Sequence, residues 1–94
     1  MQGIPFEWDL RKESANRRKH GIGFAEASTV FGDPLSITIL DPDHRSEEDL
    51  FVIVGTSSEQ KLLVVVHTIR GEQIRTISAR AAAKHERRYE ETFF

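Results

Sequence analysis

The sequence predicts an α+β fold: two N-terminal helices, a four-stranded antiparallel meander sheet and a C-terminal helix, in a single domain over residues 1–94. Three observations predict it. Helix caps and helix-favouring residues occupy the first third of the chain, strand-like runs fill the middle, and the last stretch opens with three alanines. Helices kept apart from a continuous run of strands favour an α+β arrangement, and a chain of 94 residues has the length of one small domain.

The first helix is expected over residues 10–19, because Asp9 occupies the N-cap position and Gly21 follows the C-terminal end. Within that range the only apolar side chains are Leu10 and Ala15. A surface helix normally carries about three or four apolar residues per two turns to hold it on a core. The sequence therefore raises the question of what a largely polar, cationic helix does.

The second helix is expected over residues 24–31, where Phe24, Ala27, Val30 and Phe31 form a core stripe, and Asp33-Pro34 ends it. Four strands follow. The first alternates apolar and polar residues, and the next two are nearly continuous β-branched runs, typical of central strands covered on both faces.

The four strand ranges are 35–40, 50–56, 62–69 and 73–80, with a hairpin turn at Gly71-Glu72 before the last. A short extra strand at residues 6–8 also fits the pattern. The final helix is expected over residues 81–92.

The formal net charge of −2 argues against a nucleic-acid partner, but the charges are segregated along the chain. Residues 11–20 carry five cations against Glu13 alone, and residues 70–88 carry six cations against two glutamates, a local balance of +4 in each case. Residues 41–49, in contrast, hold five carboxylates against Arg45. A basic surface patch is therefore compatible with the acidic total.

The chain has no cysteine, which excludes disulfides, thiolate metal sites and cysteine nucleophiles and fits a reducing compartment. No run of about 18 apolar residues could span a bilayer, and the N-terminus lacks the pattern of a signal peptide. We therefore expect a cytoplasmic protein without membrane association.

One face of the first helix is expected to carry Lys12, Asn16, Lys19 and His20, which are spaced at i, i+4, i+7 and i+8. Two cations, an amide and an imidazole could hold a phosphodiester while His20 moves a proton. The same spacing suits a solvated helix whose lysine stems pack on aromatic side chains and whose His20 lies near the negative end of the helix dipole. Spacing alone favours the solvated helix.

A second cationic set follows the last hairpin and the final helix. Its members are Arg70, Arg75, Arg80, Lys84, Arg87 and Arg88. Guanidinium groups are planar and suit phosphate, so a groove between hairpin and helix could follow a nucleic-acid backbone. Ordinary surface pairing with nearby glutamates explains the same residues equally well.

Neither a metal site nor a serine nucleophile is expected. The acidic segment 41–49 lacks the central glycine and the distal glutamate of an EF-hand loop, and a solvated turn explains it better. His67 and His85 have no second histidine at the spacing of zinc ligands. Ser78 has no neighbouring base in the sequence.

Two long stretches carry a family resemblance: FEWDLRKESANRRKHGIGFAEASTVFGDP, from Phe6, and ISARAAAKHERRYEE, from Ile77. The matching positions are Phe6, Glu7, Trp8, Asp9, Lys12, Asn16, Lys19, His20, Phe24, Ala27, Val30, Phe31, Asp33, Pro34, Thr68, Arg70, Ile74, Arg75, Ile77, Ser78, Ala79, Arg80, Glu86 and Tyr89. On these residues nearly the whole chain resembles the BrnT family of toxins, the ribonuclease halves of type II toxin-antitoxin pairs. It departs from the family pattern at Gly23, at Ala25, at the closing Phe93-Phe94, and at His67, where an aromatic residue is expected.

The resemblance implies a compact fold similar to the RelE toxins, cleavage of RNA and inhibition of translation. It also implies neutralisation by a BrnA-type antitoxin with a ribbon-helix-helix DNA-binding part. The expected partners are thus this antitoxin in a hetero-oligomer, an RNA substrate, and operator DNA only indirectly through the antitoxin. The cationic helix would then bind RNA or an acidic antitoxin segment, while Phe6, Trp8 and Phe24 anchor its ends to the core.

Cleavage of RNA without a metal or other cofactor uses the 2′-hydroxyl of the substrate to attack the adjacent phosphate. The enzyme supplies a base, a proton for the leaving oxygen, and cations for the charge on the phosphate. The expected catalytic residues are His20 for proton transfer, Lys12, Arg70 and Arg80 for the phosphate, and Glu86 and Tyr89 as alternative proton-transfer groups. Lys19, Arg75, Lys84 and Arg88 are the expected RNA-binding residues.

A competing interpretation is a non-enzymatic module that binds the antitoxin and adjusts its affinity for operator DNA. Growth arrest on expression of the chain alone would favour the toxin. A general RNA-binding domain fits less well, because the aromatic residues occupy core-like positions and offer no stacking platform.

Overall fold

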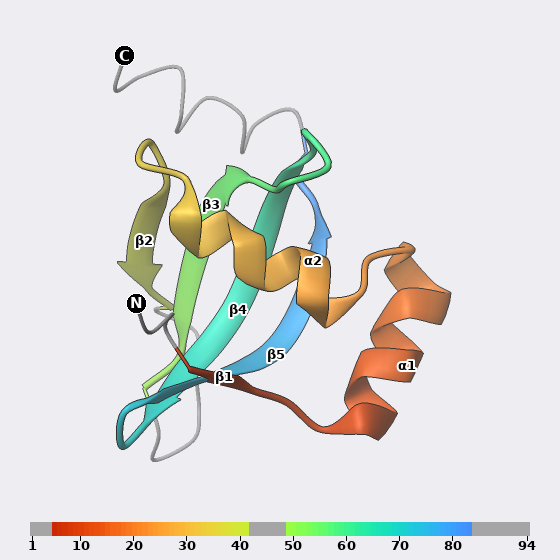
Figure 1. Cartoon of the computed structure of the whole chain (residues 1–94), viewed down its shortest axis with the longest axis vertical. Coiled ribbons are helices and arrows are strands. Elements are labelled where there is room, and N and C mark those ends of the chain that lie inside the picture. The colour runs from red at the N-terminus through yellow and green to blue at the C-terminus, as the bar shows by residue number, and fades with distance from the viewer. Residues whose placement is uncertain (1–4, 42–48, 84–94) are drawn as a thin grey trace.

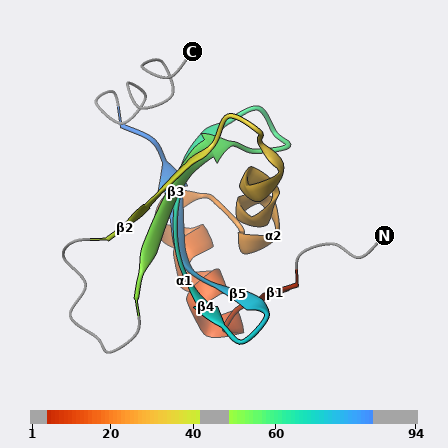
Figure 2. The same cartoon turned by 90° about the vertical axis from the view of Figure 1, so that its left-hand side faces the viewer.

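The computed structural model describes residues 5–41 and 49–83. In chain order the elements are β1 (Phe6–Glu7), α1 (Leu10–His20), α2 (Phe24–Ser28), the 3₁₀ helix η1 (Thr29–Gly32), β2 (Ile37–Leu40), β3 (Phe51–Thr56), β4 (Leu62–Arg70) and β5 (Gln73–Ala81). In this part of the chain the strands form one sheet in the order β1-β5-β4-β3-β2. Helix α2 crosses one face of the sheet, and α1 runs beside β5 (Figures 1 and 2).

The α+β class and the meander are confirmed, but the sheet has one strand more than predicted. Strands β2 to β5 pair antiparallel with their neighbours in sequence order. Strand β1, the short extra strand that the sequence allowed, pairs parallel to β5, with Phe6 beside Ile74 and Glu7 beside Arg75. The four-stranded antiparallel sheet is therefore corrected to a five-stranded mixed sheet.

The second helix is shorter than the predicted range 24–31. Its α-helical part ends at Ser28, and the next turn is 3₁₀. The Ser28 and Thr29 hydroxyls donate to the carbonyls of Ala25 and Glu26 at 2.7 and 2.6 Å. Hydroxyls that bond to the preceding turn disturb regular α-helical geometry, and tight 3₁₀ turns are common at helix ends.

The predicted start of the final helix at Ala81 is wrong, because Ala81 is the last residue of β5 and lies opposite Leu63 of β4. Pairing with a neighbouring strand overrides the high helix propensity of alanine at this position. The remainder of that predicted helix, from Lys84 onward, lies outside the described residues.

The core lies between α2 and the middle of the sheet. Its buried members are Ile22, Phe24, Ala27, Val30, Ile53, Leu63, Val65 and Ala79, with Trp8 and Phe31 packed against them. Because side chains alternate between the faces of a strand, the consecutive burial of Leu63, Val64 and Val65 shows that both faces of β4 are covered at this point. This confirms the prediction made from its β-branched run.

Helix α1 is attached to the sheet by a buried amide and not by an apolar stripe. Asn16 is 7% exposed, whereas Leu10 is 75% exposed. The Asn16 Nδ2 donates to the carbonyls of Ala79 and Ile22 at 2.8 and 2.9 Å, and its Oδ1 accepts from the Ala79 N–H at 3.1 Å. The side chain thereby bonds both main-chain groups of Ala79, as a neighbouring strand would.

A buried carboxylate makes the second attachment of α1. Glu13, also 7% exposed, accepts hydrogen bonds from the Phe24 N–H at 3.3 Å and from Arg17 Nη2 at 2.6 Å. These bonds lower the pKa of Glu13, the Arg17 bond most strongly. A Cβ at Gly23 would lie 3.1 Å from Glu13 Oε2, so the turn between the two helices comes close to this carboxylate.

The aromatic anchors predicted for this helix are confirmed in part. Trp8 packs edge to face on Phe24, with ring centroids 6.1 Å apart, and Phe6 packs in the same way on Phe31 at 5.2 Å. Together with Asn16 and Glu13 they hold a helix that has almost no apolar face.

In the described part of the chain, no helix is long and apolar enough to cross a bilayer.

Candidate functional site

Helix α1 and strand β5 lie side by side and run in the same direction, so that residues from both ends of the sequence share one edge of the molecule (Figure 1). On α1, Lys12, Lys19 and His20 are exposed. Asn16, which was expected on the same cationic face, instead points into the protein and bonds to Ala79. Three of the four predicted residues therefore remain accessible, and Asn16 serves to attach the helix.

The start of α1 forms a charged cluster with β1 and β5. Asp9 caps the helix, because its Oδ1 accepts from the main-chain N–H groups of Arg11 and Lys12 at 2.7 and 3.2 Å. The bond from Lys12 contributes most to lowering the pKa of Asp9, followed by the bond from Arg11, and the charges of Lys12 and Arg75 add to it. The Asp9 carboxylate is thus ionised at neutral pH beside two of the predicted site cations.

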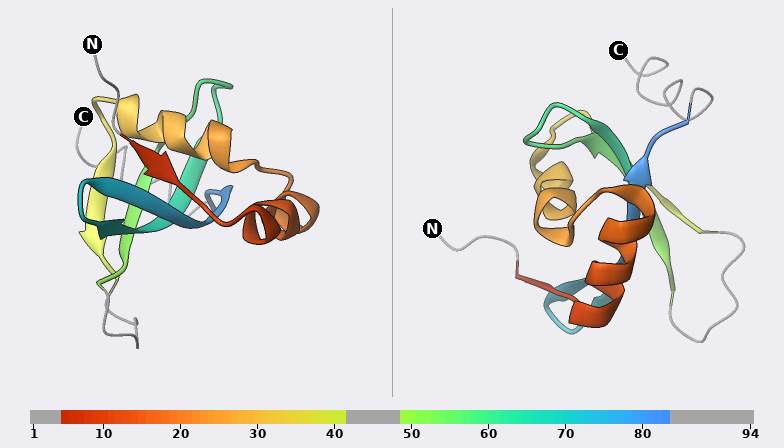
Figure 3. Two further views of the ribbon diagram at one scale, coloured as in Figure 1. Left: turned by 60° about the horizontal axis from the view of Figure 1, so that its bottom comes forward. Right: turned by 90° about the vertical axis from the view of Figure 1, so that its right-hand side faces the viewer.

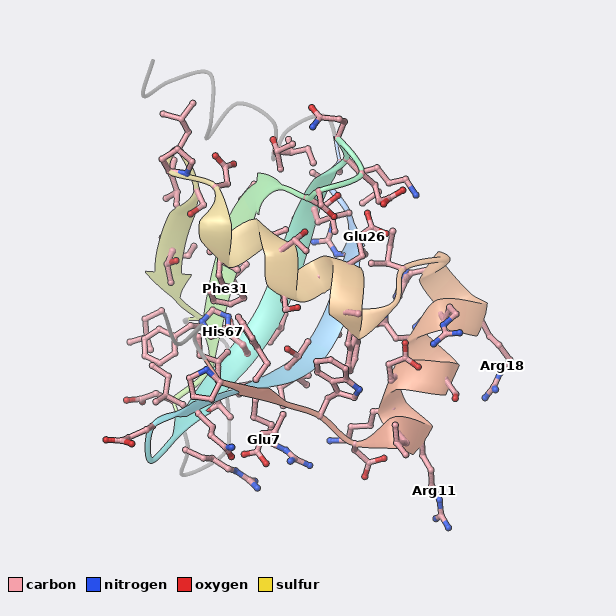
Figure 4. All side chains as sticks on the ribbon, in the orientation of Figure 1. Glu7, Arg11, Arg18, Glu26, Phe31 and His67 are labelled. Carbon is pink, nitrogen blue, oxygen red and sulfur yellow. The ribbon has the colours of Figure 1, made fainter. Side chains whose placement is uncertain are left out.

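The same cluster includes Glu7, whose Oε2 lies 3.4 Å from Arg75 Nη1. We define this charged cluster as Glu7, Asp9, Lys12 and Arg75. Figure 4 labels Glu7 at the end of the molecule where β1 meets α1. The sequence predicts Asp9 only as the helix cap and gives Glu7 no role, although a signal is present: the two carboxylates alternate with the aromatic Phe6 and Trp8, which places both on one face of an extended segment.

The C-terminal turn of α1 is cationic and is terminated by a glycine C-cap. Arg17, Arg18, Lys19 and His20 occupy it, and Gly21 adopts the left-handed conformation, with φ of 73°, while its N–H donates to the Arg17 carbonyl at 2.8 Å. Cations at this position are stabilised by the helix dipole. Figure 4 shows Arg18 and Arg11 pointing away from the sheet, so these two arginines do not face β5.

The predicted arginines of the last hairpin are spread along it. Arg70 pairs with Gln73 at the turn, Arg75 with Thr68, and Arg80 with Val64 at the other end. At about 3.3 Å per residue, the seven steps from Gln73 to Arg80 span roughly 23 Å. Arg70 and Arg80, both expected at one phosphate, therefore lie at opposite ends of the hairpin. Arg80 directly follows Ala79, the residue to which Asn16 of α1 bonds.

His67, which departs from the family pattern, lies in the core. It is 3% exposed, stacks on Phe51 with ring centroids 5.8 Å apart, and meets Phe31 edge to face at 4.8 Å (Figure 4). Burial lowers the pKa of His67, and its Nδ1 has no hydrogen-bond partner among the described residues. The imidazole thus occupies the position of an aromatic core residue and lies away from the α1–β5 edge.

Several predicted residues are not described. Lys84, Glu86, Arg87, Arg88 and Tyr89 lie outside the described residues. The same holds for residues 42–48, most of the acidic segment that was interpreted as a solvated turn. Over residues 5–41 and 49–83, no group of three or more histidine, aspartate or glutamate side chains is arranged to hold a metal ion.

An open polar hollow lies at the other end of the sheet from the hairpin turn, between η1 and the β3–β4 turn, and Thr29, Asp33, Thr56, Ser57 and Ser58 contribute to its lining. Its polar groups bond to one another: the Ser58 N–H donates to Thr29 Oγ1 at 2.8 Å, and the Thr56 N–H donates to Asp33 Oδ2 at 2.8 Å. The hollow contains no predicted site residue, and its hydrogen bonds fasten η1 to the sheet.

The sequence model of the ribonuclease toxin BrnT of type II toxin-antitoxin systems matches residues 8–86 of the chain. The chain belongs to the BrnT family. This confirms the resemblance predicted from the sequence, and it makes the chain a member of a family of ribonuclease toxins.

The fold of this BrnT-family chain is similar to that in the 1.1 Å crystal structure of the Brucella abortus ribonuclease toxin BrnT. The TM-score is 0.64 at 20% sequence identity, and the similarity covers 87% of this chain and 100% of the Brucella chain. No curated protein sequence matches the chain.

Proposed function

We propose that this BrnT-family chain is a metal-independent endoribonuclease toxin that cleaves RNA, inhibits translation and is neutralised by a BrnA-type ribbon-helix-helix antitoxin. The observation that carries the proposal is the cationic edge, which we define as Lys12, Lys19 and His20 of α1 together with Arg75 and Arg80 of β5. Family membership supplies the reaction class, and the edge supplies the chemistry that an RNA backbone requires: cations for phosphate oxygens and an imidazole for proton transfer.

The two ends of the edge have different roles in this proposal. Lys12 and His20 are eight residues apart, which is about 12 Å along a helix axis. One phosphate cannot contact both groups closely, so the RNA strand runs along the edge and meets them at successive nucleotides. Arg75 and Lys12 bind one phosphate at the start of α1, where Glu7 pairs with Arg75 and the Asp9 carboxylate lies within the field of both cations.

Cleavage takes place at the other end of the edge, beside His20. The 2′-hydroxyl of the substrate attacks the adjacent phosphorus, the bond to the 5′-oxygen breaks, and a 2′,3′-cyclic phosphate forms without a metal ion or an added nucleophile. His20 transfers a proton, and Lys19 and Arg80 stabilise the charge that develops on the phosphate. Glu86 and Tyr89 remain alternative proton-transfer groups, while Arg70, Lys84 and Arg88 bind flanking parts of the strand.

The test uses purified protein in EDTA with a defined RNA and the matching DNA. We expect cleavage of RNA only, because DNA lacks the attacking 2′-hydroxyl. The double variant Lys12→Ala/Arg80→Ala should cleave at least about a hundredfold more slowly. The double variant Arg11→Ala/Arg18→Ala is the matched control: it removes the same charge from side chains that point away from the sheet, and it should cleave close to the wild-type rate (Figure 4).

His20 has its own test. Replacement by Ala should lower the cleavage rate by about two to four orders of magnitude. A loss of less than about tenfold in a folded variant would remove His20 from the role and leave Glu86 and Tyr89 as candidates. Addition of the protein to a cell-free translation reaction, with and without the antitoxin, tests the inhibition of translation.

The non-enzymatic alternative predicts a different set of results. A chain that only binds the antitoxin would neither cleave RNA nor stop cell growth when expressed alone. RNA left intact in vitro together with growth arrest in cells would instead indicate cleavage that depends on the ribosome.

A further inference from the structure

The two edges of the sheet differ in how their main-chain groups are covered. The outer side of β5 is covered in part: β1 pairs with Ile74 and Arg75, and the Asn16 side chain bonds both main-chain groups of Ala79. The β2 edge lies at the opposite side of the sheet (Figures 1 and 3). Among residues 5–41 and 49–83, β3 is the only strand that pairs with β2.

Alternation in the β2–β3 ladder indicates which groups face outward. The Asp41 N–H donates to the Leu50 carbonyl at 2.7 Å, one step beyond the pair Leu40 and Phe51. In an antiparallel ladder, pairs that exchange hydrogen bonds alternate with pairs that do not. The N–H and C=O groups of Thr38 and Leu40 therefore point away from β3, toward the outer edge.

The side chains of this edge are apolar and exposed. Leu35, Ile39 and Leu40 are 49%, 43% and 51% exposed. Natural edge strands are usually protected by a lysine, a proline or a bulge. The strand ITIL contains neither lysine nor proline, and its pairing with β3 is regular. Within the described part of the chain, β2 is thus a regular edge strand to which a further strand can pair.

The charges beside β2 select the kind of strand that can pair there. The sequence is acidic on both sides of β2: Asp33 precedes the strand, and the segment 41–49, with five carboxylates against Arg45, follows it directly. Antiparallel pairing of two copies of the chain would bring the Asp33 end of one copy toward the Asp41 end of the other. Repulsion between these like charges disfavours pairing of two copies of the chain. Lysines or arginines at the ends of an incoming strand favour its pairing with β2.

We propose that β2 is the docking edge for the antitoxin: an extended antitoxin segment with alternating apolar side chains, flanked by lysine or arginine, pairs with β2 and extends the sheet. The main chain of Thr38 and Leu40 provides the hydrogen bonds, and Leu35, Ile39 and Leu40 provide the apolar contacts. This inference rests on the proposed function, since it concerns the partner that a toxin-antitoxin pair requires. It assigns that partner to the edge opposite the one that binds RNA.

The test measures the dissociation constant between the chain and the ribbon-helix-helix protein encoded by the neighbouring reading frame, by calorimetry. Thr38→Pro removes an N–H that points outward and preserves the bonds to β3, because proline is tolerated on the outer side of an edge strand. Leu40→Lys adds the usual protection against strand addition. Leu10→Lys is the matched control, because it makes the same substitution at a leucine on α1 that is also exposed, 75% against 51% for Leu40.

We expect Thr38→Pro and Leu40→Lys to weaken antitoxin binding at least about tenfold, with RNA cleavage and the melting temperature retained and with wild-type affinity for Leu10→Lys. Wild-type affinity in both β2 variants would overturn the inference and leave the proposed function intact. A wild-type chain that cleaves RNA but does not bind this protein would overturn the assignment of the partner. A wild-type dimer that Leu40→Lys converts to monomers would show that a second copy occupies the edge.

Discussion

Replacement of Asn16 by Ala tests whether a single amide holds the cationic helix on the sheet. The substitution removes three hydrogen bonds and leaves the Ala79 N–H and two carbonyl groups, of Ala79 and Ile22, without that partner. Each lost bond is worth about 1 kcal/mol. Alanine recovers roughly 0.6 kcal/mol because it is the better helix former. The expected net loss of unfolding free energy is therefore about 2 to 3 kcal/mol.

Such a loss is large for a small domain, whose total stability is on the order of 5 to 15 kcal/mol. It corresponds to a fall in melting temperature of roughly 10 to 20 °C. Urea denaturation followed by the fluorescence of Trp8, the only tryptophan, measures it directly. Trp8 packs on Phe24, so its emission reports the region where α1 joins the core.

Two further variants give the result its meaning. Ser14→Ala, at an exposed position on the same helix, should change the free energy by no more than about 0.5 kcal/mol. Asn16→Asp keeps the acceptor for the Ala79 N–H but directs a carboxylate at two carbonyl oxygens, so it should destabilise the protein at least as much as Asn16→Ala at pH 7. If Asn16→Ala cost less than about 0.5 kcal/mol, the attachment of α1 by this amide would be refuted.

Two more predictions concern the core. Burial lowers the pKa of His67, so below about pH 6.5 the unfolded chain binds a proton that the folded chain does not. The wild-type free energy of unfolding should therefore fall between pH 7.5 and 5.5, by up to about 1.4 kcal/mol per pH unit below pH 6.5. His67→Phe should make this fall smaller. Urea denaturation at the two pH values measures this, and an unchanged pH dependence would contradict it. Gly55→Ala should cost about 1 to 3 kcal/mol, because a Cβ there would lie 2.8 Å from Ser36 Cβ and 2.9 Å from Val30 Cγ1. Gly32→Ala is the control, because a Cβ there meets nothing within 4 Å, and thermal melts should show no comparable loss of stability. Equal losses for the two substitutions would show that close packing at Gly55 does not cause the destabilisation.

The sequence predicts only part of the cationic edge and of the charged cluster. Lys12, Lys19 and His20 could be assigned to one helix because helical spacing is a local property. That the charges of Lys12 and Arg75 both act on Asp9, however, depends on β1 pairing parallel with β5, which lies more than sixty residues later in the sequence. Glu7 and Asp9 join the cluster for the same reason, and no spacing rule along the sequence indicates it.

Two of the wrong predictions have one physical cause, which is a partner distant in sequence. Helix propensity predicts a helix at Ala81, but strand pairing with Leu63 overrides a propensity of a few tenths of a kcal/mol per residue. Asn16 was assigned to the exposed cationic face because a polar residue is usually solvated. Its partner, Ala79, lies 63 residues away in the sequence and becomes available only once the sheet has formed.

By itself the sequence determined the α+β class, the order of two helices followed by four strands, the meander, the cap at Asp9 and membership of the BrnT family. These features depend on neighbouring residues: alternation, helical spacing, caps and turns act over a few positions. Only the tertiary structure decided that a polar helix is held by an amide, that β1 and Asn16 cover part of β5 while β2 pairs regularly with β3 alone among the described strands, and that Arg70 lies far from Arg80. Those features depend on hydrogen bonds and distances between segments that the chain brings together only on folding.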